Sequence, residues 1–407
     1  MKIDTSVPFV ALKLVPEYFD HATVGIVRSL GRLGVDTIAF HDAPHAPAAS
    51  SRYSRRRCIW NAEADPGFDP VDLLRKLSDW IDGRAVMLAT DDVSSTVLSE
   101  HAATLSEWYV FPEQPPGLAQ SLYDKRGMAE ICERLDIPTP GNVFPRDRDE
   151  VMRFAEDATY PIVLKAIDSW RLQADTGTRM AIVEDRHSLL EEYDRLASAD
   201  PENLMLQEYI PGGAESVWML DGYYNADSDC LFAVTGRKLR QFPPYTGMTS
   251  LGVCVPNPEV ERLTQRLAKE IGYRGVLDLG YRFDARDGQY KLLDVNPRVG
   301  ASLRLFVGDG GMDAVRAAYL DLSGQEVPRS KTQPGRRWVV ENLDLVSSRR
   351  YLRDGSLTAG SWLASFRGVR EAAWFALDDP LPFVSMAWRF GVMKARGTAN
   401  RGRFGAS

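Results

Sequence analysis

In the first part of the chain, segments whose hydrophobic residues have the spacing of a strand alternate with segments that have the spacing of a helix. Val7–Val15 is an apolar run typical of a buried strand. The segments that follow alternate between helical and strand spacing, namely His21–Leu33 (helix), Asp36–Phe40 (strand), Leu73–Ile81 (helix) and Ala85–Ala89 (strand). Strands separated by helices favour parallel pairing, so we expect an α/β domain with a parallel sheet over residues 1–115.

A Pro-rich segment, Phe111–Gly117, predicts a domain boundary. Beyond it the spacing predicts helices over 128–135 and 149–158, strands over 160–167 and 180–183, a helix over 187–197 and a strand over 203–210. A β-rich stretch over 215–255, a helix over 258–271 and a hairpin of 275–283 with 290–295 complete a second unit, residues 116–327. Residues 328–407 are rich in Arg and Trp, show no long strand and form a predicted C-terminal extension.

Composition narrows the function classes. The chain has 407 residues, of which 44% are hydrophobic and 26% charged, with a net charge of −7 that argues against bulk binding to nucleic acid or an acidic membrane. No apolar stretch approaches the roughly 18 residues that a membrane span needs, and the N-terminus lacks a signal-peptide cleavage site, so we expect a cytoplasmic protein. The four cysteines form no C-x-x-C pair and are expected to be free thiols. The dipeptide Gly-Lys never occurs, which excludes a Walker A loop.

The predicted hairpin carries oxygen ligands. Asp278 shares one face of its strand with Gly280 and Arg282, while Asp294 and Asn296, two residues apart on the returning strand, project to one side. Carboxylate and amide oxygens suit Mg²⁺, and Arg298 directly beyond suits the charge of a transferring phosphoryl group. A solvated Asp–Arg surface hairpin is the alternative interpretation.

Lysine is scarce, because only 10 of the 49 basic residues are lysines. Lys165 lies in an apolar strand, where an ammonium is costly unless it meets an anion, and Lys125 precedes it by forty residues. Glu208, Tyr209 and Ile210 then end an extended segment whose backbone can bond an adenine edge, with Glu215 just beyond for a ribose hydroxyl. A buried ion pair and an ordinary edge strand remain the alternatives.

The order of these segments resembles the ATP-grasp superfamily, and within it the carboxylate–amine ligases of the D-aspartate-ligase-like group. The matching stretches lie within Leu118–Phe306 and are SLYDKRGMAEICERLDIPTP, YPIVLKA, LMLQEYIPGG, AVTGRKLRQFPP and GYRGVLDLGYRFDARDGQYKLLDVNPRVGASLRLF. The resemblance implies an α+β ATP-grasp fold whose two subdomains clasp ATP, with a lid over about 125–205, after the α/β front domain.

The resemblance also implies roles for individual residues. Lys125 and Lys165 would hold the ATP phosphates, Gln207, Glu208, Tyr209 and Ile210 would line the adenine pocket, and Glu215 would meet the ribose. Asp294 and Asn296 would bind Mg²⁺ or Mn²⁺, and Arg298 would stabilise the acyl-phosphate transition state. Arg237, Lys238 and Arg240 would face phosphate or a substrate carboxylate, Lys238 and Arg240 as catalytic residues and Arg237 on ATP. Arg304, with Arg298 and Arg240, suggests an anionic acceptor substrate.

Three positions depart from the family pattern. The strand-end metal ligand is Asp294 rather than the usual glutamate, and the partner carboxylate is replaced by Gly280. We therefore assign that metal-ligand role to Asp278 on the same face. The glycine-rich phosphate loop expected after Lys165 is reduced to Asp175–Thr178.

The expected activity joins a small-molecule carboxylate to an amine through an acyl-phosphate, with release of ADP and phosphate. Carboxylation, kinase-type transfer and a non-catalytic ATP-binding module remain alternatives. We expect no nucleic-acid partner and no stable membrane insertion, and a homodimer is left open. The segment Trp388–Ser407 has five basic residues and no acidic one. We expect a solvated tail there, with a membrane-surface or acidic-partner role as the alternative.

Overall fold

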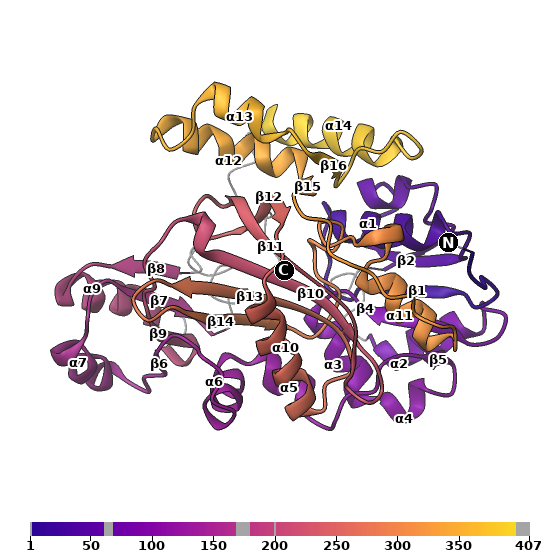
Figure 1. Cartoon of the computed structure of the whole chain (residues 1–407). Coiled ribbons are helices and arrows are strands. Elements are labelled where there is room, and N and C mark those ends of the chain that lie inside the picture. The colour runs from indigo at the N-terminus through magenta and orange to yellow at the C-terminus, as the bar shows by residue number, and fades with distance from the viewer. Residues whose placement is uncertain (1, 61–67, 168–179, 199–200, 396–407) are drawn as a thin grey trace.

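The computed structural model describes residues 2–60, 68–167, 180–198 and 201–395. Three sheets organise this part of the chain (Figure 1). They have five, seven and four strands. The predicted phosphate loop, Asp175–Thr178, and the end of the tail, 396–407, lie outside the described residues.

The first sheet is parallel throughout and has the strand order β3-β2-β1-β4-β5. Its strands are β1 (Phe9–Leu12), β2 (Thr37–His41), β3 (Arg56–Ile59), β4 (Ala85–Ala89) and β5 (Tyr109–Val110). The helices between them are α1 (His21–Gly31), the short 3₁₀ turn η1 (Pro47–Ser50), α2 (Pro70–Ser78), α3 (Asp92–Glu100) and α4 (Ala102–Leu105). The parallel α/β front domain predicted from the alternating pattern is confirmed.

The four-stranded sheet is antiparallel, with the order β6-β9-β7-β8. It contains β6 (Asn142–Val143), β7 (Ile162–Ala166), β8 (Met180–Val183) and β9 (Leu204–Glu208). The helices α7 (Arg148–Asp157) and α9 (Arg186–Ala197) bury their apolar sides, including Val151 and Leu189, against Leu164 and Leu206 of this sheet. Its small core is separate from the other hydrophobic clusters, as expected of a subdomain with its own packing.

The seven-stranded sheet has the order β14-β13-β10-β11-β12-β15-β16. Its strands are β10 (Val217–Tyr224), β11 (Cys230–Phe242), β12 (Met248–Cys254), β13 (Gly275–Asp284), β14 (Gln289–Asn296), β15 (Arg337–Val339) and β16 (Val369–Ala372). One face packs with α5 (Leu118–Tyr123), α6 (Lys125–Arg134) and α10 (Pro258–Ile271). The other face packs with α11 (Ala314–Leu322) and with residues of the front domain. The helix that begins at Lys125 thus packs on the seven-stranded sheet and not on the four-stranded one.

The C-terminal segment is built into the molecule. β15 pairs antiparallel with β12, and β16 extends the same sheet. The helices α12 (Glu341–Arg353), α13 (Ala359–Ser365) and α14 (Leu381–Ala395) form the upper edge of the view in Figure 1. Within the described residues, no helix is both long and apolar enough to cross a membrane.

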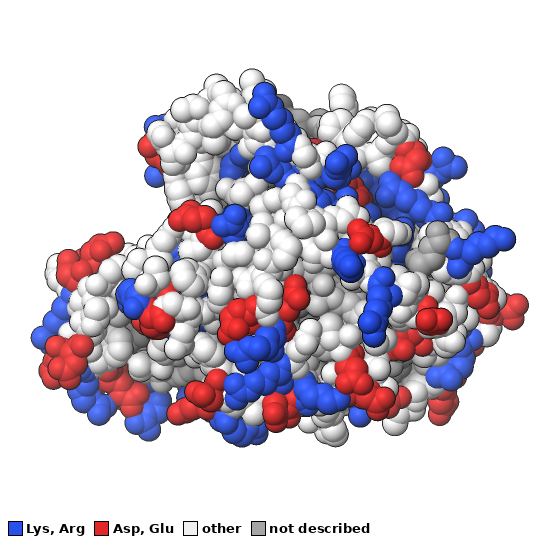
Figure 2. Space-filling model, viewed as in Figure 1, with Lys and Arg blue, Asp and Glu red and all other residues white. Residues whose placement is uncertain are grey.

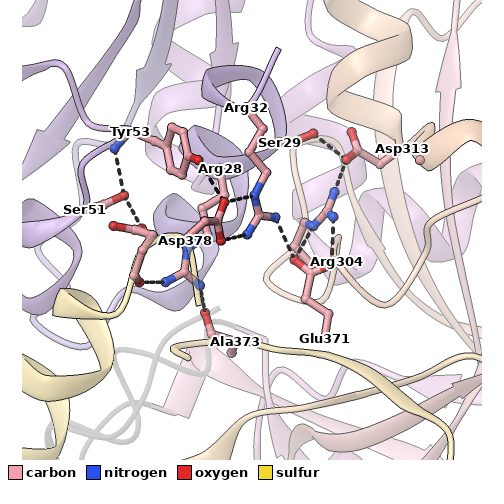
Figure 3. A network of polar contacts seen from close by, with 12 residues as sticks. Arg28, Ser29, Arg32, Ser51, Tyr53, Arg304, Asp313, Glu371, Ala373 and Asp378 are labelled. Atoms are coloured by element: carbon pink, nitrogen blue, oxygen red, sulfur yellow. Dashed lines mark hydrogen bonds and ion pairs between the residues drawn. The ribbon is translucent and has the colours of Figure 1, made fainter. Parts of the chain in front are cut away.

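A buried polar network fastens this segment to the front domain (Figure 3). The Arg28 guanidinium of α1 donates to Asp379 Oδ2 over 2.9 Å and to the carbonyl oxygens of Ala373 and Trp374. Asp379 also accepts from the Ser51 hydroxyl, 2.7 Å away. These partners lie more than three hundred residues apart in sequence. The network therefore holds the C-terminal segment against the front domain.

Candidate active site

Cations and carboxylates from separate elements meet where β14 ends. Lys125 is the first residue of α6, which starts there because the side chain of Asp124 accepts hydrogen bonds from the Arg126 and Gly127 amides. The Lys125 ammonium forms an ion pair with Asp294 of β14. Lys165, on β7 of the four-stranded sheet, is close enough to both for its charge to interact with theirs. Two sheets therefore contribute to one polar cluster.

The electrostatics of this cluster suit an anionic ligand. Burial alone would raise the pKa of Asp294, but the ammonium groups of Lys125 and Lys165 and the Arg298 guanidinium hold that pKa below its usual value. Burial and the neighbouring Lys125 ammonium lower the pKa of Lys165 to about 8. Three cations, Lys125, Lys165 and Arg298, thus act on the Asp294 carboxylate, and a phosphate would supply further negative charge.

Asp278 and Asn296 lie opposite one another in the ladder of β13 and β14. The Asn296 amide donates to the Asp278 backbone carbonyl over 3.2 Å and to Asp294 Oδ2 over 3.4 Å. Burial raises the pKa of Asp278 to about 6, although Arg298 and Lys238 oppose that rise. The pleat of the hairpin therefore places both predicted carboxylate ligands and the amide on one face.

Lys238 approaches the same face from β11. Its ammonium donates to the Gly247 carbonyl over 3.0 Å. Burial lowers its pKa, while the carboxylates of Asp278 and Asp294 act in the opposite direction. Because those carboxylates act on it, the Lys238 ammonium is part of the same polar cluster.

Arg298 joins the cluster to the front domain. Its Nε donates to Asp92 Oδ1 over 3.1 Å, and its Nη2 donates to Asn296 Oδ1 over 3.2 Å. Asp92 begins α3 directly after β4, at the carboxyl end of a parallel strand. Sequence reasoning did not select Asp92, but a polar residue at that edge of a parallel sheet is the signal that marks it.

The predicted adenine segment follows β9. Gln207 donates to Asn142 Oδ1 over 2.7 Å, Ile210 is buried, and Tyr209 lies between Glu208 and Ile210 in the loop. The Glu208 carboxylate forms ion pairs with Arg286 and with Lys291, the latter at 3.4 Å. Glu215 accepts from the Gly213 amide over 3.0 Å in a short 3₁₀ turn, η4 (Ala214–Ser216). These ion pairs tie the end of the four-stranded sheet to the β13–β14 hairpin, and sequence reasoning missed both of the basic partners.

Three arginines assigned to the site from the resemblance have other partners in the structure. Arg240 donates through Nε and Nη2 to Asp344 of α12, over 2.7 and 2.9 Å, so those donors are already occupied. Arg304 is held by Asp313 and by Glu371, the latter over 2.8 and 2.9 Å (Figure 3). The guanidinium of Arg237 stacks on the Trp218 ring, 5.3 Å from its centre. Arg240 and Arg304 are therefore interpreted as structural, since buried carboxylates neutralise them.

The donor set fits a hard cation that also binds phosphate. Asp278, Asp294 and Asn296 provide oxygen atoms, the ligands that Mg²⁺ uses together with phosphate and water. Within the described residues, no group of three or more His, Cys, Asp or Glu side chains could hold a metal ion. A Cβ added to Gly280 would meet nothing closer than Asp294 Cβ at 3.8 Å, so the place of a third carboxylate is vacant.

Comparisons with known proteins bear on this arrangement. No family model matches the chain. The D-aspartate ligase of Enterococcus faecium (strain Aus0004) is 27% identical over 289 residues, which are 66% of this chain and 67% of that protein. The structure of N5-carboxyaminoimidazole synthetase from Staphylococcus aureus complexed with ADP superposes with a TM-score of 0.64 at 12% identity, covering 87% of this chain and 88% of that one. This chain has an ATP-grasp fold.

A second structure agrees with this ATP-grasp assignment. The L-amino acid ligase from Bacillus licheniformis superposes with a TM-score of 0.58 at 15% identity, covering 83% of this chain and 79% of that one. The fold class predicted from the sequence, a parallel α/β domain followed by an ATP-grasp fold, is confirmed. At these identities the superpositions establish the fold, and the reaction has to be argued from the site.

Proposed function

We propose that this ATP-grasp protein is an ATP-dependent ligase that activates a carboxylate as an acyl-phosphate and joins it to an amine. The observation that carries the proposal is the convergence of Lys125, Lys165 and Asp294 from three elements on one polar cluster. Similarity in sequence to a D-aspartate ligase supports amide formation as the reaction.

The site residues divide the work. Lys125 and Lys165 would neutralise the phosphates of ATP, with the adenine against Gln207–Ile210 and the ribose at Glu215. Asp278, Asp294 and Asn296 would hold Mg²⁺ or Mn²⁺, which supplies charge neutralisation at the phosphate oxygens when bound. Arg298 and Lys238 lie beside these ligands and would face the transferred phosphoryl group.

The reaction proceeds in two steps. A carboxylate oxygen attacks the γ-phosphorus, the bond to the β-phosphate oxygen breaks, and ADP leaves. The amine nitrogen then attacks the carbonyl carbon of the acyl-phosphate, inorganic phosphate leaves with the bridging oxygen, and the nitrogen loses a proton. Positioning and fixed charges suffice for both steps, so no nucleophilic side chain is required.

The proposal is tested by ADP release from the full chain with ATP, Mg²⁺ and pairs of carboxylates and amines, with D-aspartate first among the carboxylates. With an ¹⁸O-labelled carboxylate, the released phosphate should carry one labelled oxygen. Asp294→Ala with Asn296→Ala should abolish turnover, whereas Asp287→Ala, in the turn of the same hairpin, should leave it unchanged.

Other outcomes would point to the alternatives. ADP release that needs bicarbonate but no amine would favour carboxylation. ATP binding without ADP release from any pair would favour a non-catalytic ATP-binding module. The absence of a carboxylate at Gly280 is the observation that supports this alternative. Turnover retained in the double variant would overturn the metal assignment.

A further inference from the structure

Helix α14 is apolar on two sides. Met386 and Phe390 point into the main core, where they pack with residues of the front domain and of α12. On the other side, Leu381 and Val384 are each 57% exposed and Trp388 is 71% exposed, while Leu377 just before the helix is 89% exposed. We call Leu377, Leu381, Val384 and Trp388 the outer stripe. A surface helix ordinarily presents polar side chains to water, so an apolar outer face needs a cover.

The charges around the outer stripe are positive. Two acidic residues just before α14 are neutralised, because Asp378 pairs with Arg32 over 2.8 Å and Asp379 pairs with buried Arg28 over 2.9 Å. Among the described residues, Arg389 and Lys394 of α14 form no ion pair with a carboxylate, and the Lys394 ammonium lies over the Phe390 ring. The last twenty residues carry five basic and no acidic side chains in a chain whose net charge is −7. Positive charge is therefore concentrated at the C-terminal end of the sequence.

Two alternative partners, the C-terminal residues 396–407 and a second copy of the protein, fit the outer stripe poorly. Residues 396–407, RGTANRGRFGAS, contain a single large apolar side chain, Phe404, and cannot match four exposed apolar residues. A second copy docked through the same face would bring the two sets of basic residues together, because a twofold interface places each patch against itself. An anionic lipid surface has neither defect, since it offers an apolar layer beneath negative headgroups.

We propose that the outer stripe, together with Arg389 and Lys394 of the same helix, docks this protein on an anionic lipid bilayer. The stripe combines Leu, Val and Trp with flanking Arg and Lys, the composition that places a helix in the headgroup region of a membrane. The upper face in Figure 2, over α13 and α14, is largely free of acidic side chains. Asp294 belongs to β14, at the opposite edge of the seven-stranded sheet from β16, the strand that precedes α14.

The test measures co-sedimentation of the full-length protein with vesicles of phosphatidylcholine alone or mixed with phosphatidylglycerol. We expect binding to the mixed vesicles that weakens as salt is raised. Leu381→Ser with Trp388→Ser should reduce the bound fraction at least tenfold. Trp80→Ser is the matched control, because Trp80 is also an exposed tryptophan but lies in the front domain, and this variant should bind as the parent does.

Two results would overturn the proposal. One is equal sedimentation of the double variant and the parent, which would show that the outer stripe is not the docking surface. The other is no binding to either kind of vesicle, including the case where light scattering finds a dimer that the double variant lacks. Melting temperatures of all variants, unchanged from the parent because the substituted side chains are exposed, separate loss of docking from loss of fold.

Discussion

Two neighbouring aspartates offer a direct test of how the C-terminal segment is held. Asp379 is buried, with a 1% exposed side chain, and pairs with the equally buried Arg28, whereas the side chain of Asp378 is 43% exposed and pairs with Arg32. Removing one partner of a buried pair leaves an uncompensated charge, so Asp379→Ala should cost about 3–5 kcal/mol. Asp378→Ala should cost only about 0–1 kcal/mol, because water screens an exposed pair.

These free energies convert into melting temperatures. With an unfolding entropy of about 2.1 cal/mol/K per residue, a chain of 407 residues that unfolds as one unit loses about 4–6 °C in Tm for Asp379→Ala. Asp378→Ala should then lose about 1 °C or less. Replacing both buried partners, as Arg28→Met with Asp379→Leu, should recover much of the loss because no buried charge is left unpaired.

Differential scanning calorimetry on the four proteins checks the reasoning. If Asp379→Ala lowers Tm no more than Asp378→Ala does, burial does not decide the strength of these pairs. If the double replacement is less stable than Asp379→Ala, the argument from unpaired charge fails even though the network of Figure 3 still fastens the segment.

Three further predictions concern the site. A glutamate in Gly280→Glu has room beside Asp294 and should lower the Mg²⁺ concentration for half-maximal ADP release several-fold. In Gly300→Ala the new Cβ would stand 2.4 Å from Asp278 Oδ2 and displace that carboxylate, so the required Mg²⁺ concentration should rise. The pKa of Lys165 is lowered to about 8, so ATP affinity measured by calorimetry should fall as pH rises above that value in the parent but not in Lys165→Arg, which stays charged. Asp221 is fully buried opposite Asp278, and burial raises its pKa well above the 3.8 of an exposed aspartate. The unfolded chain therefore loses this proton at a lower pH than the folded protein does, and the contribution of Asp221 to folding becomes unfavourable as pH rises above 3.8. Asp221→Asn should therefore be more stable than the parent at neutral pH in urea titrations, with the difference vanishing near pH 3.8, and an unchanged difference across this range would contradict the assignment.

Features that depend on local spacing could be predicted from the amino-acid sequence. Alternating strand and helix patterns predicted the parallel front sheet, because such units pair in parallel. The period of two along a strand placed Asp294 and Asn296 on one side of β14. These inferences needed only neighbouring residues or a known order of segments. The family resemblance singled out Lys125 and Lys165, but their approach to Asp294 became visible only in the structure.

The division of the charged side chains into catalytic candidates and structural residues required the folded structure. Arg240, Arg298 and Arg304 cannot be told apart by their sequence context. In the structure, Arg240 pairs with Asp344, and Arg304 pairs with Asp313 and Glu371. Arg298 instead donates to Asp92, which lies 206 residues away in sequence. The partner of a charged side chain is set by the path of the whole chain rather than by its neighbours. For the same reason no local pattern showed that β15 and β16 complete the central sheet, since a strand of three or four residues acquires its stability from the strand it pairs with.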